Sequence, residues 1–411
     1  MLRAVRPVLL CLLLVLPAIV LRLSGAQPGA PVALLIYGGA VVAASFVLAW
    51  AAEAAEVDIS SGLAVALLAV IAVLPEYAVD LYFAYRAGER PEYVQYAAAN
   101  MTGSNRLLLG LGWSVVVLIS LFLASRQSGR PVQMLILHHR YRLELGFLLV
   151  ASLIALVIPL TGEIHLVLGI ALLGFFVFYL IRVSRGDGAG NEERELIGPA
   201  ARIGSLAPSQ RRPLVVAMFA GSALAILACA EPFAEALVGS GAALGIDHFL
   251  LVQWLAPLAS EAPEFIVAIL FAVRGKAAMA LGILISAKVN QWTLLIGSLP
   301  VAYGLGGGSA ALVLDSRQVE EMVLTTTQTL MGVAILLMLR FPRWAAWTLL
   351  GLFAVQFAIP GTQGRYLISA VYAVIAFISL INFRHQILPT LTAPFRRTVP
   401  AQTRQPDSVP V

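Results

Sequence analysis

Leu74-Pro75-Glu76 and Ala262-Pro263-Glu264 each place a proline and a glutamate inside a long apolar run. Proline removes a backbone donor, so it leaves a carbonyl oxygen without its helical partner. An ionised carboxylate inside hydrocarbon is costly unless a cation or a wet cavity compensates it. Two such segments in corresponding positions of a chain predict broken helices around a midplane ion site, the arrangement of secondary transporters.

The composition is that of a polytopic membrane protein. Of the 411 residues, 60% are hydrophobic and 12% are charged, and the mean hydropathy is +0.90. A hydrocarbon core of about 30 Å needs about 20 apolar residues per helix, and many runs are long enough. The net charge of +5 reflects topology rather than nucleic-acid binding, because the basic residues lie mostly between the apolar runs. Cys11 and Cys229 lie in apolar runs, which disfavours a disulfide or a cysteine metal site.

The apolar runs predict about twelve crossings of the bilayer. They fall at residues 7–23, 31–50, 60–84, 94–124, 143–160, 164–183, 213–231, 249–274, 277–304, 321–339, 343–359 and 366–384. The run 94–124 is too long for one straight helix, so we expect it to be bent or broken through Asn100 to Asn105.

The distribution of Lys and Arg predicts the orientation. With a cytoplasmic N-terminus, most basic residues fall in inside segments, and the outside segments hold Arg22, Arg86, Arg90, Arg317 and Arg365. This bias favours cytoplasmic N- and C-termini in a cell membrane, inner or plasma. The first run, with Arg3 and Arg6 before it, also resembles a cleavable signal peptide.

A hydrophilic linker divides the chain into two halves. Residues 184–212 form this linker between a first half, 31–183, and a second half, 213–360. Residues 1–30 form an N-terminal membrane segment or signal peptide, and residues 361–384 form an extra membrane helix. Residues 385–411 form a cytoplasmic tail that we expect to be disordered.

The two halves contain a weak duplication. Setting Glu76 on Glu264 aligns residues 72–87 with residues 260–275, and each Pro-Glu helix ends at an arginine followed within two residues by a glycine, Gly88 or Gly275. By the loop count, Glu76 lies on a helix that runs outward and Glu264 on a helix that runs inward. We therefore expect an all-α fold of two inverted five-helix repeats, with one extra helix at each end and the two glutamates close to each other near the centre.

These motifs resemble those of the cation/calcium exchanger superfamily, which includes sodium/calcium exchangers. That family has two inverted repeats, each with a Gly-Thr-Ser-x-Pro-Glu-like segment and a Gly-Asn-x-x-Gly-Ser-Asn-like segment. The first repeat matches through Pro75-Glu76 and residues 99–105, and the second matches through residues 259–264 and loosely through residues 282–288. The resemblance implies a secondary active antiporter that moves a cation through a midplane carboxylate site by alternating access.

The expected ion-binding residues carry oxygen atoms on shared helix faces. Residues three or four apart on a helix are neighbours, and hard cations prefer carboxylate, amide and hydroxyl oxygens. The predicted set is Glu76, Asp80, Asn100, Ser104, Asn105, Ser260, Glu261 and Glu264, with Glu76 and Glu264 as the metal ligands. Simpler roles stay open, namely an outer-interface position for Asp80 and helix–helix hydrogen bonds for the two asparagines and Ser104.

The second repeat departs from the family pattern. Ile283 replaces its coordinating asparagine, and Lys288 stands where its last asparagine would be. Lys288 and Arg106 lie at membrane depth, and we expect them to compensate the charge of the site carboxylates; Arg106 is alternatively a helix-locking partner. One hypothesis is that the Lys288 ammonium replaces a monovalent cation, which changes the stoichiometry or introduces proton coupling. The alternative is an ion pair with Glu261 or Glu264.

Other function classes fit the sequence less well. The chain has no His-Glu-x-x-His, Gly-x-Ser-Gly or Gly-x-Gly-Asp motif, so we expect no enzyme activity. Inverted halves with single buried glutamates favour a carrier over a channel. Sodium/calcium, calcium/proton and sodium/proton exchange all fit the oxygen donors, and a transport-inactive relative also stays open. We expect no cofactor; the partners are the lipid bilayer and the transported calcium, sodium or protons.

Overall fold

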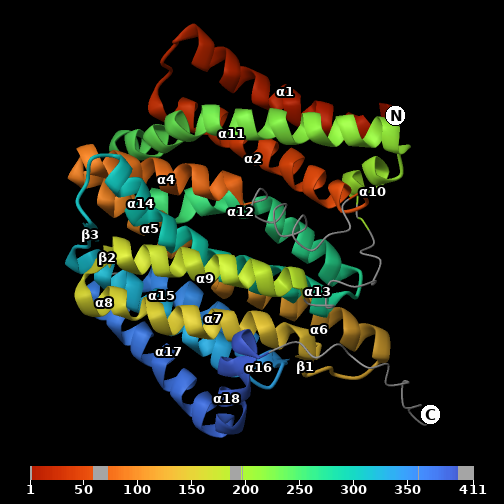
Figure 1. The fold of residues 1–411 in the computed structure, drawn as a ribbon, viewed down its shortest axis with the longest axis vertical. Helices are drawn as coiled ribbons and strands as arrows, with labels where there is room; N and C mark the ends of the chain where they lie inside the picture. Colours follow the sequence, from red (N-terminus) through yellow and green to blue (C-terminus); the bar gives the residue numbers. More distant parts are fainter. Residues whose placement is uncertain (1, 59–72, 186–195, 197, 360, 397–411) are drawn as a thin grey trace.

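The computed structural model describes residues 2–58, 73–185, 196, 198–359 and 361–396, and it is almost entirely helical. The α-helices are α1 Leu2–Ser24, α2 Ala30–Ala55, α4 Leu74–Glu89, α5 Val94–Leu107, α6 Ser114–Ser128, α7 Arg142–Ala155, α8 Val157–Thr161, α9 Leu166–Arg185, α10 Gly198–Gly204, α11 Pro208–Leu244, α12 His248–Val273, α13 Ala277–Asn290, α14 Ile296–Leu305, α15 Ser316–Leu336, α16 Arg343–Ala358, α17 Thr362–Asn382 and α18 Arg384–Thr392. Figure 1 shows the long helices side by side, with most of their axes along one direction.

Nine helical segments among the described residues are long and apolar enough to cross a membrane. α15 and α16 are not among them, because α15 carries Arg317, Glu320 and Glu321 and α16 has only 16 residues. α4 continues a run whose beginning, residues 60–72, lies outside the described residues. The order of the helices follows the order of the predicted runs, so the all-α polytopic fold is confirmed.

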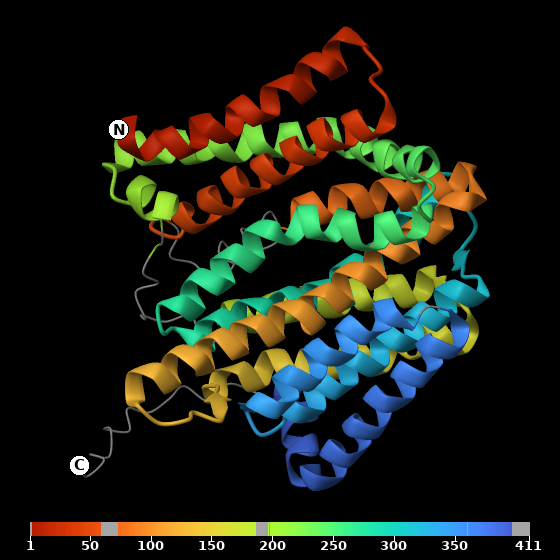
Figure 2. The ribbon, with the colours of Figure 1, turned by 180° about the vertical axis from the view of Figure 1, so that it is seen from behind.

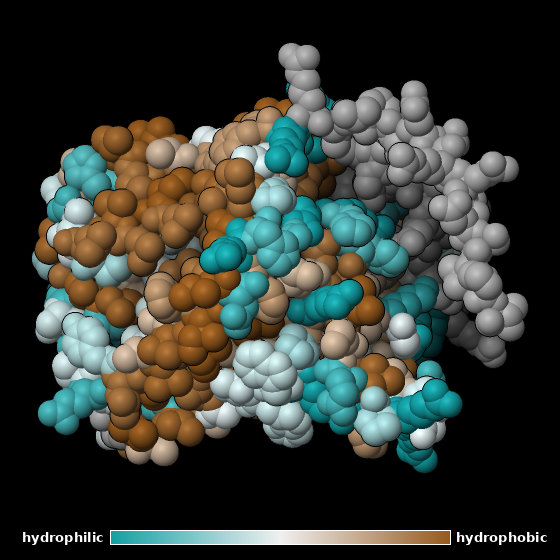
Figure 3. Space-filling model, turned by 90° about the horizontal axis from the view of Figure 1, so that it is seen from below, coloured by the Kyte–Doolittle hydropathy of each residue, from teal (hydrophilic) through white to brown (hydrophobic). Residues whose placement is uncertain are grey.

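Apolar side chains cover much of the outer surface. Leu13 on α1, Val167 on α9 and Phe377 on α17 are among the large exposed residues. Figure 3 shows apolar side chains over much of one part of a face, with hydrophilic side chains gathered toward the other part. An exposed apolar surface of this extent is unfavourable in water and suits contact with lipid tails.

Two small antiparallel sheets reveal the relation between the halves. β1 Met134–Ile136 pairs with β4 Arg340–Pro342, and β2 Glu163–His165 pairs with β3 Ala311–Val313. β1 follows α6 as β3 follows α14, and β2 precedes α9 as β4 precedes α16. Each sheet therefore joins a loop of one half to the non-equivalent loop of the other half, as expected for two inverted repeats.

Helical irregularities and flanking helices follow the same symmetry. The π-helical turn η2, Leu108–Trp113, connects α5 to α6, and the π-helical turn η5, Gln291–Leu295, connects α13 to α14. α2 and α11, the first helices of the two halves, pack along each other, while α1 packs on α2 and α17 on α15. In Figures 1 and 2, α1 and α17 lie at opposite edges of the bundle. Two five-helix repeats with one extra helix on each side are therefore confirmed.

The predicted breaks in the helices need correction. The run 94–124 is one continuous path from α5 to α6, and its irregularity is the π-helical turn η2 rather than a break through Asn100 to Asn105. Within η2, Gly112 lets the ring of Phe265 approach to a distance that a Cβ atom would not allow. α12 continues through Pro263, and Figure 2 shows it bent rather than broken. A helix packed on its neighbours tolerates the one backbone hydrogen bond that proline removes.

Two predicted connecting segments contain helices. The predicted linker 184–212 contains α10, and α11 begins within it at Pro208. The predicted disordered tail begins instead with α18 and a 3-10 turn, η6 Ala393–Phe395, which pack on α7. Arg142 at the start of α7 donates to Oε1 of Gln386 at 2.6 Å. These contacts order residues 384–395, which a polar composition alone did not indicate.

Ion pairs tie the helix ends together at one end of the bundle. Arg211 donates to both carboxylate oxygens of Asp58 at 2.8 Å each, and Arg212 donates to one of them at 3.0 Å. The hydrogen bonds from Arg211, with those from Arg212, hold the pKa of Asp58 well below its usual range. The contact joins the segment after α2 to the start of α11, near the N-terminus in Figure 1.

Candidate functional site

Glu76 and Asp80 lie on α4, which begins at the first Pro-Glu pair. Pro75 occupies the first turn of this helix, where its missing N–H would have no helical partner. Glu76 is 5% exposed and Asp80 is fully buried. Asp80 is therefore enclosed by protein rather than exposed at a surface, and it shares a helix face with Glu76.

Glu261, Glu264 and Ser260 lie on α12, in its second half. Glu261 is buried, whereas Glu264 is partly exposed. The Ser260 hydroxyl donates to the carbonyl oxygens of Ala256 at 3.1 Å and Pro257 at 3.4 Å, so it binds its own helix. Ser260 is thus near the carboxylates, and its hydroxyl oxygen keeps its lone pairs for a ligand.

Asn100, Ser104 and Asn105 are buried on α5, which packs against α4. The Ser104 hydroxyl lies beside the carboxylate of Glu76. The side chain of Asn100 faces the carboxylate of Asp80. α5 therefore supplies neutral oxygen atoms next to the two carboxylates of α4.

Lys288 is fully buried on α13, and its ammonium binds Asn105 on α5. Nζ donates to the main-chain oxygen of Asn105 at 2.5 Å and to Oδ1 of the same residue at 2.9 Å. The two residues are 183 positions apart, and each precedes a π-helical turn, which begins at Leu108 in one half and at Gln291 in the other. They occupy equivalent positions, so the ammonium lies where the two repeats meet.

The predicted ion pair between Lys288 and a glutamate does not form. No carboxylate among the described residues lies within 4.0 Å of its Nζ. Glu261 and Glu76 lie within electrostatic reach of the ammonium without touching it. An amide from the next helical turn instead donates to both carboxylates.

That amide belongs to Gln291, a site residue that our sequence analysis missed. Its Nε2 donates to Oε1 of Glu261 at 2.7 Å and to Oε1 of Glu76 at 3.2 Å. Gln291 therefore links carboxylates from the two halves. Asn290 and Gln291 form a polar pair inside an apolar run, close after Lys288, and this pattern was the available signal.

Several buried oxygen atoms around this cluster have no hydrogen-bond partner among the described residues. They are both carboxylate oxygens of Asp80, Oδ1 of Asn100, Oε2 of Glu261 and Oε1 of Gln291. An unsatisfied buried polar atom costs about 1–3 kcal/mol. Carboxylate and amide oxygens are the ligands that hard cations prefer, and carboxylates also accept protons. The donor set therefore fits a cation or proton site built from both halves.

The carboxylates of the two halves interact without forming a closed metal cluster. Glu76 lies within electrostatic reach of Glu264, and Glu261 lies within reach of both. Within the described ranges, no three His, Cys, Asp or Glu side chains are gathered closely enough to hold a metal ion.

Arg106 compensates a different carboxylate from those predicted. Its Nη2 lies 2.6 Å from Oε2 of Glu321 on α15, and both side chains are almost completely buried. Gln253 on α12 donates to the same oxygen at 3.1 Å and to the Thr102 hydroxyl at 3.4 Å. Arg106 therefore pairs with Glu321 rather than with one of the predicted site carboxylates, and these contacts fit the alternative helix-locking role.

Arg365 completes this second polar cluster. Its Nη2 lies 2.7 Å from Oε2 of Glu320, and its Nη1 lies 3.7 Å from Oε1 of Glu321. The sequence analysis did not consider these two glutamates, because Glu320 precedes the apolar run 321–339 and Glu321 begins it, so both resemble the end of a loop.

A comparison with protein families identifies the same two halves. The model of the sodium/calcium exchanger protein family matches residues 29–185 and 214–360. The chain belongs to the sodium/calcium exchanger family. This result confirms the superfamily and the cation antiporter function inferred from the motifs. The members of this family are transporters.

Solved structures of exchangers are also similar to this chain. The crystal structure of the H⁺/Ca²⁺ exchanger CAX is 41% identical in sequence, with a TM-score of 0.88 over 96% of this chain and 98% of that chain. The Ca²⁺/H⁺ antiporter protein YfkE is 16% identical, with a TM-score of 0.58 over 89% and 99% of the two chains. A structure of the sodium-calcium exchanger NCX_Mj is 18% identical, with a TM-score of 0.51 over 81% and 99%. The last two likenesses concern the fold alone. A comparison with curated proteins found no match.

Proposed function

We propose that this exchanger moves calcium in exchange for protons across a cell membrane, through a site formed by Glu76, Glu261 and Glu264. The observation that carries the proposal is the ammonium of Lys288 on Asn105, at the meeting point of the repeats. The 41% identity to an H⁺/Ca²⁺ exchanger over nearly the whole chain supports calcium and protons as the two exchanged ions. The proposed orientation has cytoplasmic N- and C-termini.

The Lys288 ammonium disfavours a sodium ion at this position for two reasons. It uses the main-chain and side-chain oxygens of Asn105, which a sodium ion would otherwise need as ligands. When protonated, it also places a positive charge in a poorly solvated interior, which repels a second cation. A proton needs one carboxylate oxygen rather than a cage of ligands, so proton exchange is less affected.

The balance of charge indicates how calcium and protons compete. Glu76, Asp80, Glu261 and Glu264 oppose the Lys288 ammonium, so full ionisation gives −4 + 1 = −3. One calcium ion reduces this to −1, and one retained proton makes the site neutral. We assign that proton to Asp80, which is fully buried and faces the uncharged Asn100.

Gln291 is suited to exchange its partners during this cycle. Its amide nitrogen donates to Glu76 and Glu261, while its Oε1 has no hydrogen-bond partner in the described structure. A change of side-chain rotamer would offer Oε1 to a cation held by the same glutamates. Protonation of the glutamates would then release the cation and restore the amide contacts.

Ion-resolved transport in proteoliposomes tests the proposed ions. Calcium uptake should follow an opposing pH gradient, and a pH-sensitive dye should report proton movement in the opposite direction. An opposing sodium gradient should add nothing to the calcium flux. Calcium flux driven by sodium without a pH change would contradict the proposal, and no flux under any gradient would favour a transport-inactive relative.

A further inference from the structure

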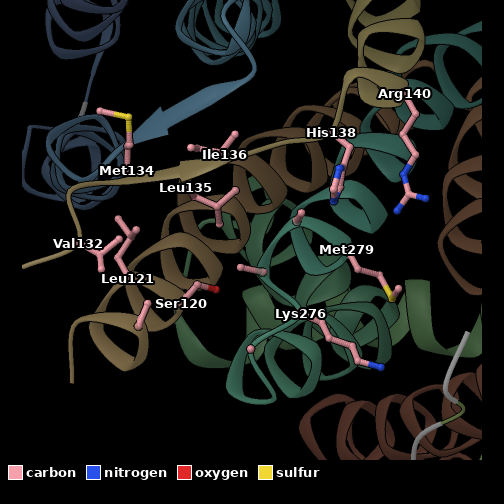
Figure 4. A pocket seen from close by; sticks show the side chains of 14 residues that line it. Ser120, Leu121, Val132, Met134, Leu135, Ile136, His138, Arg140, Lys276 and Met279 are labelled. Atoms are coloured by element: carbon pink, nitrogen blue, oxygen red, sulfur yellow. The ribbon is translucent and has the colours of Figure 1, made fainter. Parts of the chain in front are cut away.

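A cavity of about 580 Å³ lies away from the carboxylate site, at one end of the bundle. Its walls come from the second half of α6, strand β1, the segment before α7 and the first turn of α13. Figure 4 shows these four segments around the cavity. It lies beside the short turn between α12, which carries Glu261 and Glu264, and α13, which carries Lys288.

The two sides of the cavity differ in chemistry. His138, Arg140 and Lys276 supply positive or titratable groups, and Figure 4 shows His138 and Arg140 on the same side as Met279. The opposite side is apolar and includes Leu121, Val132, Met134 and Leu135. The apolar character continues onto the surface, because Met134 is 41% and Ile136 is 64% exposed. The cavity is therefore amphipathic, and exposed apolar side chains of β1 stand beside its apolar side.

The first turn of α13 adds donors to the basic side. α13 begins at Ala277, and no described side chain forms a capping hydrogen bond at its N-terminus. The backbone N–H groups of a first helical turn have no helical acceptor, and the helix dipole favours an anion there. Ala277, Ala278 and Met279 all line the cavity, so these donors lie beside the basic side chains.

The same charges argue against this cavity as an entrance for the transported cations. Lys276 and Arg140 would repel calcium as it approached, whereas they would attract an anion. An anion with a long apolar tail satisfies both sides of the cavity. We propose that the cavity binds an anionic phospholipid, with the phosphate at His138, Arg140, Lys276 and the α13 N-terminus and an acyl chain along Leu121, Val132 and Met134.

Native mass spectrometry of the full-length exchanger in detergent tests this assignment. The probes are phosphatidylglycerol, phosphatidylcholine with the same acyl chains, and inorganic phosphate. The wild-type protein should retain phosphatidylglycerol at collision energies that remove phosphatidylcholine. Equal retention of the two lipids would overturn the proposal, and displacement of phosphatidylglycerol by millimolar inorganic phosphate would reassign the cavity to a soluble anion.

Two variants locate the bound lipid in the cavity. Lys276→Gln should weaken phosphatidylglycerol binding about fivefold, the effect expected from one basic residue at an anionic headgroup. Ala278→Trp keeps every charge but fills the cavity, so it should abolish retention. Arg126→Gln removes an exposed charge on α6 outside the cavity and should change nothing. Unchanged binding in both cavity variants would refute the site, and these readouts do not depend on which ions the exchanger carries.

Discussion

The two halves of this exchanger share a backbone plan but differ in the charge of their equivalent positions. Both halves have a Pro-Glu helix and a π-helical turn, and the loops of each pair with the loops of the other. Before its π-helical turn, the first half has Asn105 where the second has Lys288. At the turn itself, the first half begins with Leu108 and the second with Gln291. Duplication thus preserved the scaffold, while a few side chains specialised one half as the source of an ammonium and a bridging amide.

The shared glutamates should be the most sensitive positions. Glu76→Gln and Glu264→Gln each keep the shape of the side chain but remove a charge that compensates the cation. We expect the initial rate of calcium uptake in proteoliposomes to fall about 10- to 100-fold or more in each variant. Ser45→Ala is the control, because its buried hydroxyl donates to Val41 within α2, a helix that carries none of the site residues. Wild-type rates in both glutamine variants, at equal protein levels, would exclude the proposed site.

The Arg106–Glu321 pair joins α5 of the first half to α15 of the second, and the position of the second half that is equivalent to Arg106 holds the uncharged Val289. Arg106→Met leaves Glu321 buried without its main partner, and loss of one member of a buried pair costs about 3–5 kcal/mol. Thermal unfolding in detergent should show a large loss of stability. The double variant Arg106→Met/Glu321→Leu should recover much of that loss. If the single variant were as stable as the wild type, the helix-locking role of Arg106 would be wrong.

Lys288→Asn makes the two halves alike at the position where they meet. It removes the tethered ammonium and frees both oxygens of Asn105, so a sodium ion gains ligands and loses a repelling charge. We expect calcium flux in this variant to become stimulated by an opposing sodium gradient. The loss of stability should be modest, about 1–3 kcal/mol for acceptors left without a donor. A sodium response identical to that of the wild type would refute the role of Lys288 in ion choice.

Gln291→Leu makes the second half resemble the first at the start of the π-helical turn. The variant removes the amide that links Glu76 to Glu261, while the volume of the side chain changes little. We expect the apparent calcium affinity to fall about tenfold, the effect typical of residues that orient metal ligands. Thr293→Ala is the control, because its hydroxyl donates to Val289 within the same helix at 2.6 Å. Equal calcium affinity in the two variants would remove Gln291 from the site.

The smallest effect concerns the ion pairs between the end of α2 and the start of α11. The folded pKa of Asp58 lies below the unfolded value, so its contribution is complete above about pH 5 and declines as the pH falls below about 4. Asp58→Asn should lower the thermal midpoint by a few degrees at neutral pH and by less in acid. A pH-independent difference between variant and wild type would show that the charge of Asp58 is not involved.

The sequence revealed site residues that are unusual by themselves, and it missed residues whose role depends on contacts with distant parts of the chain. Glu76, Glu264 and Lys288 are conspicuous because charge is rare in apolar runs, and the Pro-Glu duplication also indicated the inverted halves. The contact of Lys288 with Asn105 joins positions 183 residues apart, and no local pattern encodes such a pairing. Gln291 is uncharged and lies close after the conspicuous Lys288, so its sequence context did not distinguish it from a polar residue at an ordinary helix–helix contact.

Helix boundaries were less predictable than helix order for a related reason. A single sequence shows where apolar residues are dense, which locates the crossings of the bilayer. It does not show that Arg142 at the start of α7 orders the residues after α17, or that packing carries α12 through Pro263 without a break. Those features depend on neighbours supplied by distant parts of the chain.

The crossed sheets also have a consequence for biogenesis. β1 is synthesised and inserted long before β4, its partner, leaves the ribosome, and β2 likewise waits for β3. During that interval the first half carries two strands whose backbone N–H and C=O groups lack their final partners. Synthesis of the second half supplies β3 and β4, which complete the two sheets at opposite ends of the bundle. Neither half therefore reaches its mature loop structure alone.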